Sequence, residues 1–107
     1  MYSAQRAAEN ESTFRELNET LEEKANELEL SGGRTPYLCE CHDERCTQVV
    51  LLTGAEYQQV RASPRTFVLA AGHESTDDRV LRSSNDYTVV EKTGEIGSLV
   101  EERDPRS

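Results

Sequence analysis

The residues best suited to chemistry are three cysteines in the array Cys39-Glu40-Cys41 and Cys46, which has the spacing C-x-C-x4-C. Zinc in structural sites takes four sulfur or nitrogen ligands in a tetrahedron, with each sulfur about 2.3 Å from the metal. We expect a tight turn at Glu40 that lets Cys39 and Cys41 converge on one ion. The alternatives are cysteines used as small apolar side chains, or one disulfide and a free thiol. The cysteines cluster beside charged residues, which favours a site for zinc or another thiophilic ion.

The fourth ligand must come from elsewhere in the chain, and the sequence offers two histidines. His42 directly follows Cys41, so its ring has difficulty closing onto the same ion. His73 lies in a predicted turn beside Gly72, where the absence of a side chain allows close backbone approach. The other ring nitrogen of His73 would need an acceptor, either Glu74 or a backbone carbonyl. The predicted metal ligands are therefore Cys39, Cys41, Cys46 and His73.

A catalytic role is the weaker interpretation of these residues. A set of three sulfurs and one nitrogen leaves no position for water, and a sulfur-rich zinc ion is a poor Lewis acid. The combination of H-x-E with a downstream C-x-x-C, which marks zinc deaminases, is absent. A cysteine–histidine nucleophile pair would need an oxyanion turn and an orienting group that the sequence does not show. We predict no catalytic residue and keep a small zinc-dependent enzyme as an alternative.

Residues 4–30 are predicted to form a helix, because apolar residues recur close to the 3.6-residue period. Read as heptads, the a and d positions are Ala7, Asn10, Phe14, Leu17, Leu21, Lys24 and Leu28. The two polar residues in this set weaken a two-stranded coiled coil but leave a helix-mediated homodimer open. We expect the helix to pack on its own domain, as amphipathic helices commonly do, with packing on a partner as the alternative.

Gly32, Gly33 and Pro36 are predicted to end this helix. Beyond it we expect a small antiparallel sheet that positions the cysteines and the histidine, with a short helix whose capping box is Thr53 and Glu56. The predicted strands are residues 37–38, 47–52, 66–70, 79–82 and 87–91, and the predicted short helices are residues 54–62 and 95–102. The fold class is therefore α+β, with a long N-terminal amphipathic helix (1–33), a zinc-stapled mini-domain (34–102) and a tail (103–107).

Composition limits both the core and the partners. The chain has 107 residues, 35% of them hydrophobic and 6% aromatic. We therefore expect a small core that needs a further cross-link, such as a bound metal ion, for stability. A net charge of -9 repels nucleic acids and anionic membranes, and it suits a basic protein partner or simple solubility. The sequence shows no secretory signal and no transmembrane run. Three clustered cysteines suit a reducing compartment, so we expect a cytoplasmic location.

These observations favour a non-enzymatic, zinc-stabilised adaptor that binds a protein, with the transcription machinery or another basic assembly as the expected partner. The alternative from a different class is an acidic mimic of nucleic acid that occupies a DNA-binding protein. Such mimics spread a higher charge density over one face, so the mimic is the weaker interpretation.

Two resemblances add to this interpretation. The spacing from Cys39 to Cys46 resembles the zinc motif of the post-SET segment of histone lysine methyltransferases, which also takes its fourth ligand from a distant part of the chain. The rest of the sequence does not resemble a SET domain, so the likeness implies a coordination geometry and no methyltransferase activity.

A longer resemblance is to a group of small uncharacterised bacterial proteins from actinobacteria. It is carried by the residues 6–28, 38–41, 46–47, 56–57, 60–62, 67–74, 87–92 and 104–106. The group pairs C-E-C with a third cysteine and G-H-E, which implies that His73 is a ligand. Members usually carry glycine at the position of His42, which implies that His42 is a variable loop residue.

Overall fold

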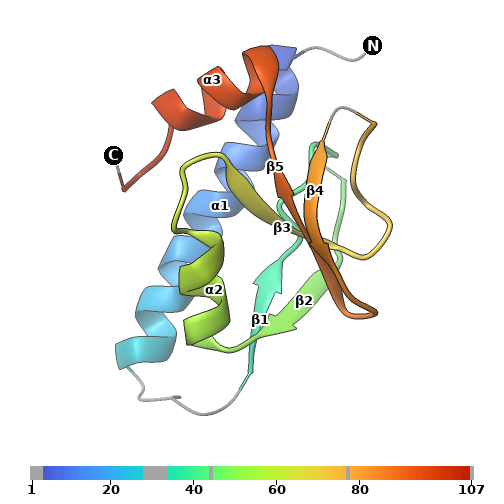
Figure 1. Cartoon of the computed structure of the whole chain (residues 1–107). Helices are drawn as coiled ribbons and strands as arrows, with labels where there is room; N and C mark the ends of the chain where they lie inside the picture. Colours follow the sequence, from blue (N-terminus) through green and yellow to red (C-terminus); the bar gives the residue numbers. More distant parts are fainter. Residues whose placement is uncertain (1–3, 28–33, 44, 77, 107) are drawn as a thin grey trace.

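The computed structural model describes residues 4–27, 34–43, 45–76 and 78–106 of the chain, and the side chains of 25–27 are not described. These ranges contain three helices and five strands (Figure 1). In chain order they are α1 (Ala4–Glu27), β1 (Thr35–Leu38), β2 (Val49–Leu52), α2 (Gly54–Val60), β3 (Thr66–Ala70), β4 (Arg79–Ser83), β5 (Tyr87–Glu91) and α3 (Gly94–Glu102). The predicted α+β class is confirmed; residues 28–30, which the sequence assigns to the first helix, lie outside the described ranges.

The five strands form two antiparallel sheets, whereas the sequence predicts one. β1 pairs with β2, and the second sheet has the order β3-β5-β4. The residues that follow β1 join the sheets, because the amide of Glu40 donates to the carbonyl of Val68 in the middle of β3 at 2.9 Å. The β1–β2 pair therefore contacts β3 of the three-stranded sheet where the cysteine loop begins.

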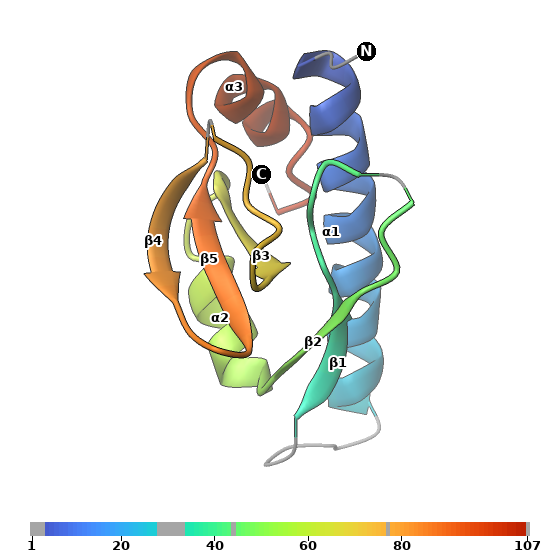
Figure 2. The same cartoon turned by 90° about the vertical axis from the view of Figure 1, so that its right-hand side faces the viewer.

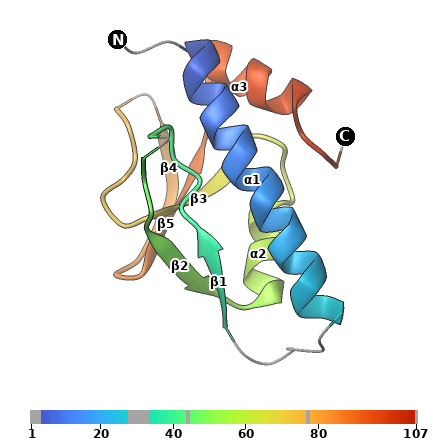
Figure 3. The same cartoon turned by 180° about the vertical axis from the view of Figure 1, so that it is seen from behind.

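α1 runs along one side of the molecule, beside β1 and α3 (Figures 2 and 3). The short helix α2 begins at the predicted capping box: Thr53 accepts from the amide of Glu56 at 3.1 Å, and Glu56 accepts from the amide of Thr53 at 2.8 Å. α3 approaches the end of β5 so closely that a side chain on Gly97 would meet the carbonyl oxygen of Lys92 at 2.6 Å. That close approach explains a glycine inside this helix.

The apolar core lies between α1, α2 and the two sheets. The rings of Tyr37 on β1 and Tyr57 on α2 stack with centroids 4.4 Å apart. Strand β3 is buried along its whole length, and Phe67 on it lies beneath the guanidinium of Arg15, 3.6 Å from the ring centroid. The fully buried apolar side chains include Leu52, Val60 and the three middle residues of β3, so the core is small, as the composition predicts.

The buried face of α1 is polar, and this was not expected from the sequence. Leu17, at the centre of the predicted apolar stripe, is 48% exposed, whereas the interior receives a different set of side chains. The buried residues of α1 are Ala7, Ala8, Glu11, Ser12, Arg15, Asn18 and Glu22. The expectation that α1 packs on its own domain is confirmed. The contacts, however, are made largely by charged and amide side chains, which form hydrogen bonds and ion pairs in the interior.

Two ion clusters hold α1 in place. Lys92 at the end of β5 contacts Glu11 at 2.7 Å and Asp78 at 2.8 Å, and all three side chains are nearly inaccessible to solvent. At the other end of the core, Arg61 pairs with Glu19 of α1 and with Asp104 beyond α3. Buried charges of this kind are tolerated only when they are paired, so these contacts fix the position of the helix.

Candidate metal centre

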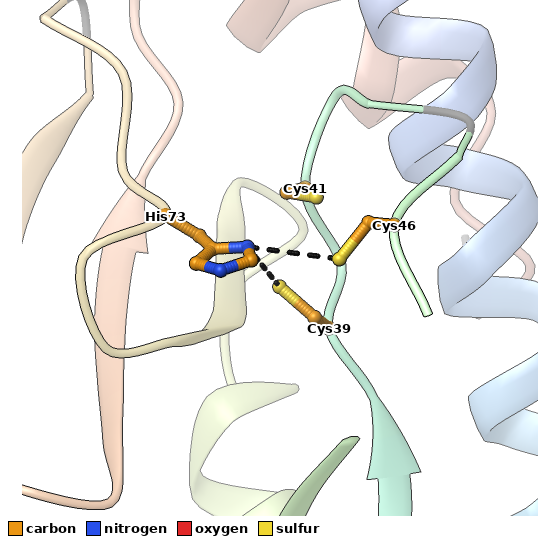
Figure 4. A group of neighbouring side chains, drawn as sticks. All are labelled: Cys39, Cys41, Cys46 and His73. Carbon is orange, nitrogen blue, oxygen red and sulfur yellow. Dashed lines mark hydrogen bonds between the residues drawn. The ribbon is translucent and has the colours of Figure 1, made fainter. Parts of the chain in front are cut away.

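The structure brings the four predicted ligands together. The sulfurs of Cys39, Cys41 and Cys46 and a ring nitrogen of His73 all lie within 4.8 Å of one another (Figure 4). Cys39 and Cys41 are buried, and Cys46 and His73 are half-buried at the rim. Within the described ranges, this is the group of histidine, cysteine and acidic side chains able to hold a metal ion.

The distances within the group suit a tetrahedral ion. Nδ1 of His73 lies 3.6 Å from the sulfur of Cys39 and 3.6 Å from that of Cys46. A zinc ion with bonds of about 2.3 Å to sulfur and about 2.0 Å to nitrogen holds a sulfur and a nitrogen about 3.5 Å apart at the tetrahedral angle. The observed separation is therefore the separation that a shared zinc ion would impose. The chemistry of the donor set, three thiols and one imidazole, also fits this ion.

Cys39 is positioned by both sheets. Its amide donates to the carbonyl of Gln48 at 3.1 Å, which continues the β1–β2 ladder one residue beyond Leu38. Its sulfur accepts a hydrogen bond from the amide of Ala70, the last residue of β3, at 3.1 Å. This hydrogen bond holds the first ligand in place, and because an amide that donates to a sulfur favours the thiolate, it opposes the rise in the pKa of Cys39 that Cys41 and burial cause.

A tight loop brings Cys41 and Cys46 to the same point. The amide of Cys46 donates to the carbonyl of Asp43 at 3.0 Å, and the Asp43 carboxylate accepts from the amide of Arg45 at 2.9 Å. The loop is also tied to α1, because the side-chain amide of Asn10 donates to the carbonyl of His42 at 2.9 Å. The sulfur of Cys46 can thus return to the cluster after four intervening residues.

His73 enters the cluster from the turn after β3. Its amide donates to the carbonyl of Ala70 at 3.0 Å, and Gly72 between them has a φ of 86°, a conformation that favours glycine. The nitrogen that faces the sulfurs is Nδ1, which leaves Nε2 on the outer side of the ring. Glu74, which the sequence offers as an acceptor for that nitrogen, is exposed. His42 is half-buried and does not belong to the group of four.

Glu40 has a role in the core that the sequence, which predicts only a turn at this residue beside the ion, does not indicate. It lies between two ligands, is completely buried, and points into the core, away from the cluster. One carboxylate oxygen accepts from Asn18 and Tyr57, each at 2.9 Å, and the other accepts from the amide of Val68 at 3.1 Å. Burial raises the pKa of Glu40, and these donors oppose that rise. Cys39 and Cys41 flank Glu40 and lie on the side of the chain opposite to its side chain, so both sulfurs reach the cluster without the tight turn that we expected at Glu40.

The crowding of the thiols changes their acidity. A hydrogen bond from Cys39 lowers the pKa of Cys41 to about 5, and the same contact, together with burial, raises the pKa of Cys39. Burial also raises the pKa of Cys46. The cluster by itself therefore favours a single thiolate at Cys41. A divalent cation bound there would favour the thiolate at all three positions, because the thiolate is the form that binds metals.

Comparison with protein-family models, with curated proteins and with solved structures finds no match to this chain. Among the described helices, none combines the length and the apolar character needed to cross a bilayer. The site and the fold are therefore interpreted from their own geometry.

Proposed function

We propose that Cys39, Cys41, Cys46 and His73 hold one structural zinc ion, and that the domain fixed by this ion is a non-enzymatic module for binding another protein. The observation that carries the metal assignment is the convergence of three sulfurs and Nδ1 within 4.8 Å, with both measured nitrogen–sulfur separations at 3.6 Å. Zinc is favoured among thiophilic ions because it prefers a tetrahedral set of sulfur and nitrogen ligands.

A structural role is favoured over a catalytic one by the surroundings of the site. Four protein ligands complete the tetrahedron and leave no position for a reacting water molecule. Glu40, the carboxylate nearest to the ligands in sequence, is engaged by donors from three residues in the core and is not directed toward the cluster. The ion would instead join three separate segments: the end of β1, the loop before β2 and the turn after β3.

A binding role is supported by the surface. The exposed large apolar side chains are Leu17, Val49, Leu51, Val80 and Leu81, and the whole chain carries a net charge of -9. Exposed apolar side chains that lie together commonly mark interaction sites, and an acidic surface attracts basic partners. A basic protein such as a component of the transcription machinery is the partner class that we propose, in a reducing cytoplasm where the thiols remain free to bind metal.

Substitution of zinc by cobalt tests the metal assignment and its ligand set. Cobalt(II) bound to three thiolates and one imidazole should give intense visible bands of a tetrahedral ion and a thiolate charge-transfer band in the near ultraviolet. His73→Ala should weaken and shift the visible bands, and the matched variant His42→Ala should leave them unchanged. A spectrum typical of six-coordinate cobalt, or equal effects of the two histidine variants, would reject the assignment.

A further inference from the structure

Two of the exposed apolar side chains, Val49 and Leu51, lie on one face of the β1–β2 sheet. In the β1–β2 pair, Val49 is directly opposite Leu38, and Leu51 is directly opposite Pro36. Alternate residues of a strand share a face, and the intervening residues, such as Val50, are buried in the core. Val49 and Leu51 are 52% and 48% exposed, so the outer face of this two-stranded sheet is apolar and accessible.

α1 extends this face. The side-chain amide of Asn18 both donates to the carbonyl of Leu38 at 2.9 Å and accepts from its amide at 2.7 Å, so Asn18 lies against the free edge of β1. Residues three and four positions away on a helix lie on the same side, and Phe14 and Leu21 stand at these distances from Asn18. Both are half-buried, as residues at the border of a face would be. Leu17 stands next to both of them and is 48% exposed.

We define the outer face as six apolar residues of the β1–β2 sheet and of the side of α1 that adjoins β1: Phe14, Leu17, Leu21, Leu38, Val49 and Leu51. Figure 3, seen from behind, shows that α1 and β1 lie next to each other on this side of the molecule. The heptad pattern of α1 is thus divided between two surroundings: Ala7 is buried in the core and Leu21 packs against it, whereas Leu17 is exposed on the outer face.

The charged residues on α1 near the outer face indicate which kind of partner could bind there. Thr13 and Thr20 border Leu17, with their hydroxyls bonded to the carbonyls of the preceding turn. Beyond these two uncharged residues, the exposed crest of α1 carries glutamates seven residues apart, with Arg6 and Lys24 near its two ends. The glutamates are Glu16, Glu23 and Glu9, of which Glu9 already pairs with Arg103 at 3.5 Å.

We infer that the outer face binds a basic amphipathic segment of another protein, an apolar ridge flanked by lysine or arginine. The apolar ridge would cover the leucines, and the cationic flanks would meet the glutamate crest. A second copy of this chain is disfavoured because it would bring a net charge of -9 against -9. This inference rests on the proposed binding function and names its surface and the chemistry of its partner.

The metal centre is connected to the outer face. Leu38 of the face is followed at once by Cys39, and Asn10, one turn before Phe14, holds the carbonyl of His42 in the cysteine loop. A metal ion at the cluster would thus fix the edge of β1 against α1. The outer face should be intact only in the metal-bound protein.

The test uses the full zinc-loaded chain and two synthetic peptides of roughly 18 residues, long enough to form a helix on contact. One peptide has leucines at helical spacing with lysines elsewhere, and the other has glutamates in place of the lysines. Fluorescence anisotropy should show binding of the Leu/Lys peptide, weakened by salt, and little binding of the Leu/Glu peptide. Equal binding of both peptides, or no binding of either, overturns the inference.

The matched variants change equal numbers of exposed apolar residues. The double variant Leu17→Ser, Leu51→Ser should weaken binding of the Leu/Lys peptide by about tenfold or more, because two half-exposed leucines lose their contacts. The control Val80→Ser, Leu81→Ser alters similarly exposed residues on β4 and should bind like the unchanged protein. Equal loss in both variants overturns the assignment of the face.

Two further readouts separate the other outcomes. Metal content and circular dichroism on every variant show whether the fold and the ion are retained, so a failure of the metal assignment is distinguished from a failure of the docking surface. Sedimentation of the zinc-loaded chain should show a monomer. A dimer that the Leu17→Ser, Leu51→Ser variant dissociates would overturn the inference in favour of a second copy as the occupant.

Discussion

The amide of Ala70 donates a 3.1 Å hydrogen bond to the sulfur of Cys39, which links the end of β3 directly to the first ligand of the metal centre. Three residues later, His73 brings its ring nitrogen within 4.8 Å of the three sulfurs and would supply the fourth ligand. The same turn therefore delivers one ligand and stabilises the charge on another. A change in the conformation of this turn would disturb both the Ala70–Cys39 hydrogen bond and the position of His73. We therefore expect the metal centre and the end of β3 to form and to unfold together.

Cys41→Ser should be far more damaging than its neighbouring substitution His42→Ala. The first removes a ligand, and structural zinc in small domains is worth on the order of 10 kcal/mol of folding free energy, of which a large part depends on a complete ligand set. The second changes a half-buried ring outside the cluster. Thermal unfolding with parallel zinc analysis compares the two. Equal losses of stability would mean that the histidine ligand has been assigned wrongly.

Glu40→Gln should destabilise the protein by about 2 kcal/mol or more, although the two side chains have nearly the same volume. Both carboxylate oxygens accept hydrogen bonds, so an amide would place an NH₂ group against a donor, either the Val68 amide or the Asn18 and Tyr57 side chains. Denaturant unfolding measures the change. Glu74→Gln, at an exposed glutamate on the other side of the site, is the control and should have no measurable effect.

The cluster of three cysteines and His73 could be predicted from the sequence because coordination chemistry restricts the choice to few residue types. Three clustered cysteines and one suitably placed histidine leave little freedom, and Gly72 marks the turn that the histidine needs. The helices and strands follow from apolar periodicity and from the Thr53–Glu56 capping box, both of which are local signals. The α+β class therefore follows from the sequence with nearly correct element bounds.

The orientation of α1 could not be predicted in the same way. Apolar periodicity indicates which residues share a face, but it does not say whether that face meets the core or the outside. The polar residues Arg15 and Asn18 are buried because their partners, the carbonyl of Thr66 and the backbone of Leu38, arrive from distant parts of the chain. Likewise, the way in which the two sheets join depends on the hydrogen bond between Glu40 and Val68, which no local pattern encodes.

Glu11 should give the protein a distinctive pH dependence. Burial raises its pKa to about 7, against the opposing effect of Lys92, while Asp78 and Cys41 add to the rise. A carboxyl group whose pKa is higher in the folded state stays protonated there while it ionises in the unfolded chain. Its contribution to the free energy of unfolding therefore falls as the pH rises from about 4.5 to about 7, by on the order of 3 kcal/mol.

The comparison of the unchanged protein with Glu11→Gln isolates this effect, because zinc binding and thiol ionisation are shared by both proteins. Denaturant unfolding from pH 5 to pH 8 should show the unchanged protein losing stability relative to Glu11→Gln as the pH increases. A difference that stays constant across this range, or that changes in the opposite direction, would contradict the assigned direction of the pKa.

Removal of the metal should loosen a defined region of the chain. A strong chelator at neutral pH is expected to increase hydrogen exchange in residues 38–74, which contain all four ligands, because the ion joins segments that the small core holds only weakly. Exchange in the β4–β5 hairpin should change less and serves as the internal control. Unchanged exchange in residues 38–74 after verified loss of metal would contradict the structural role.

The most direct measurement is the metal content of untagged protein purified without added metal, determined by elemental analysis and by native mass spectrometry. The account predicts one zinc ion per chain, lost in the Cys41→Ser variant and retained in His42→Ala. A protein that is fully folded, with reduced cysteines and no bound metal, would contradict the claim that this ion holds the domain together.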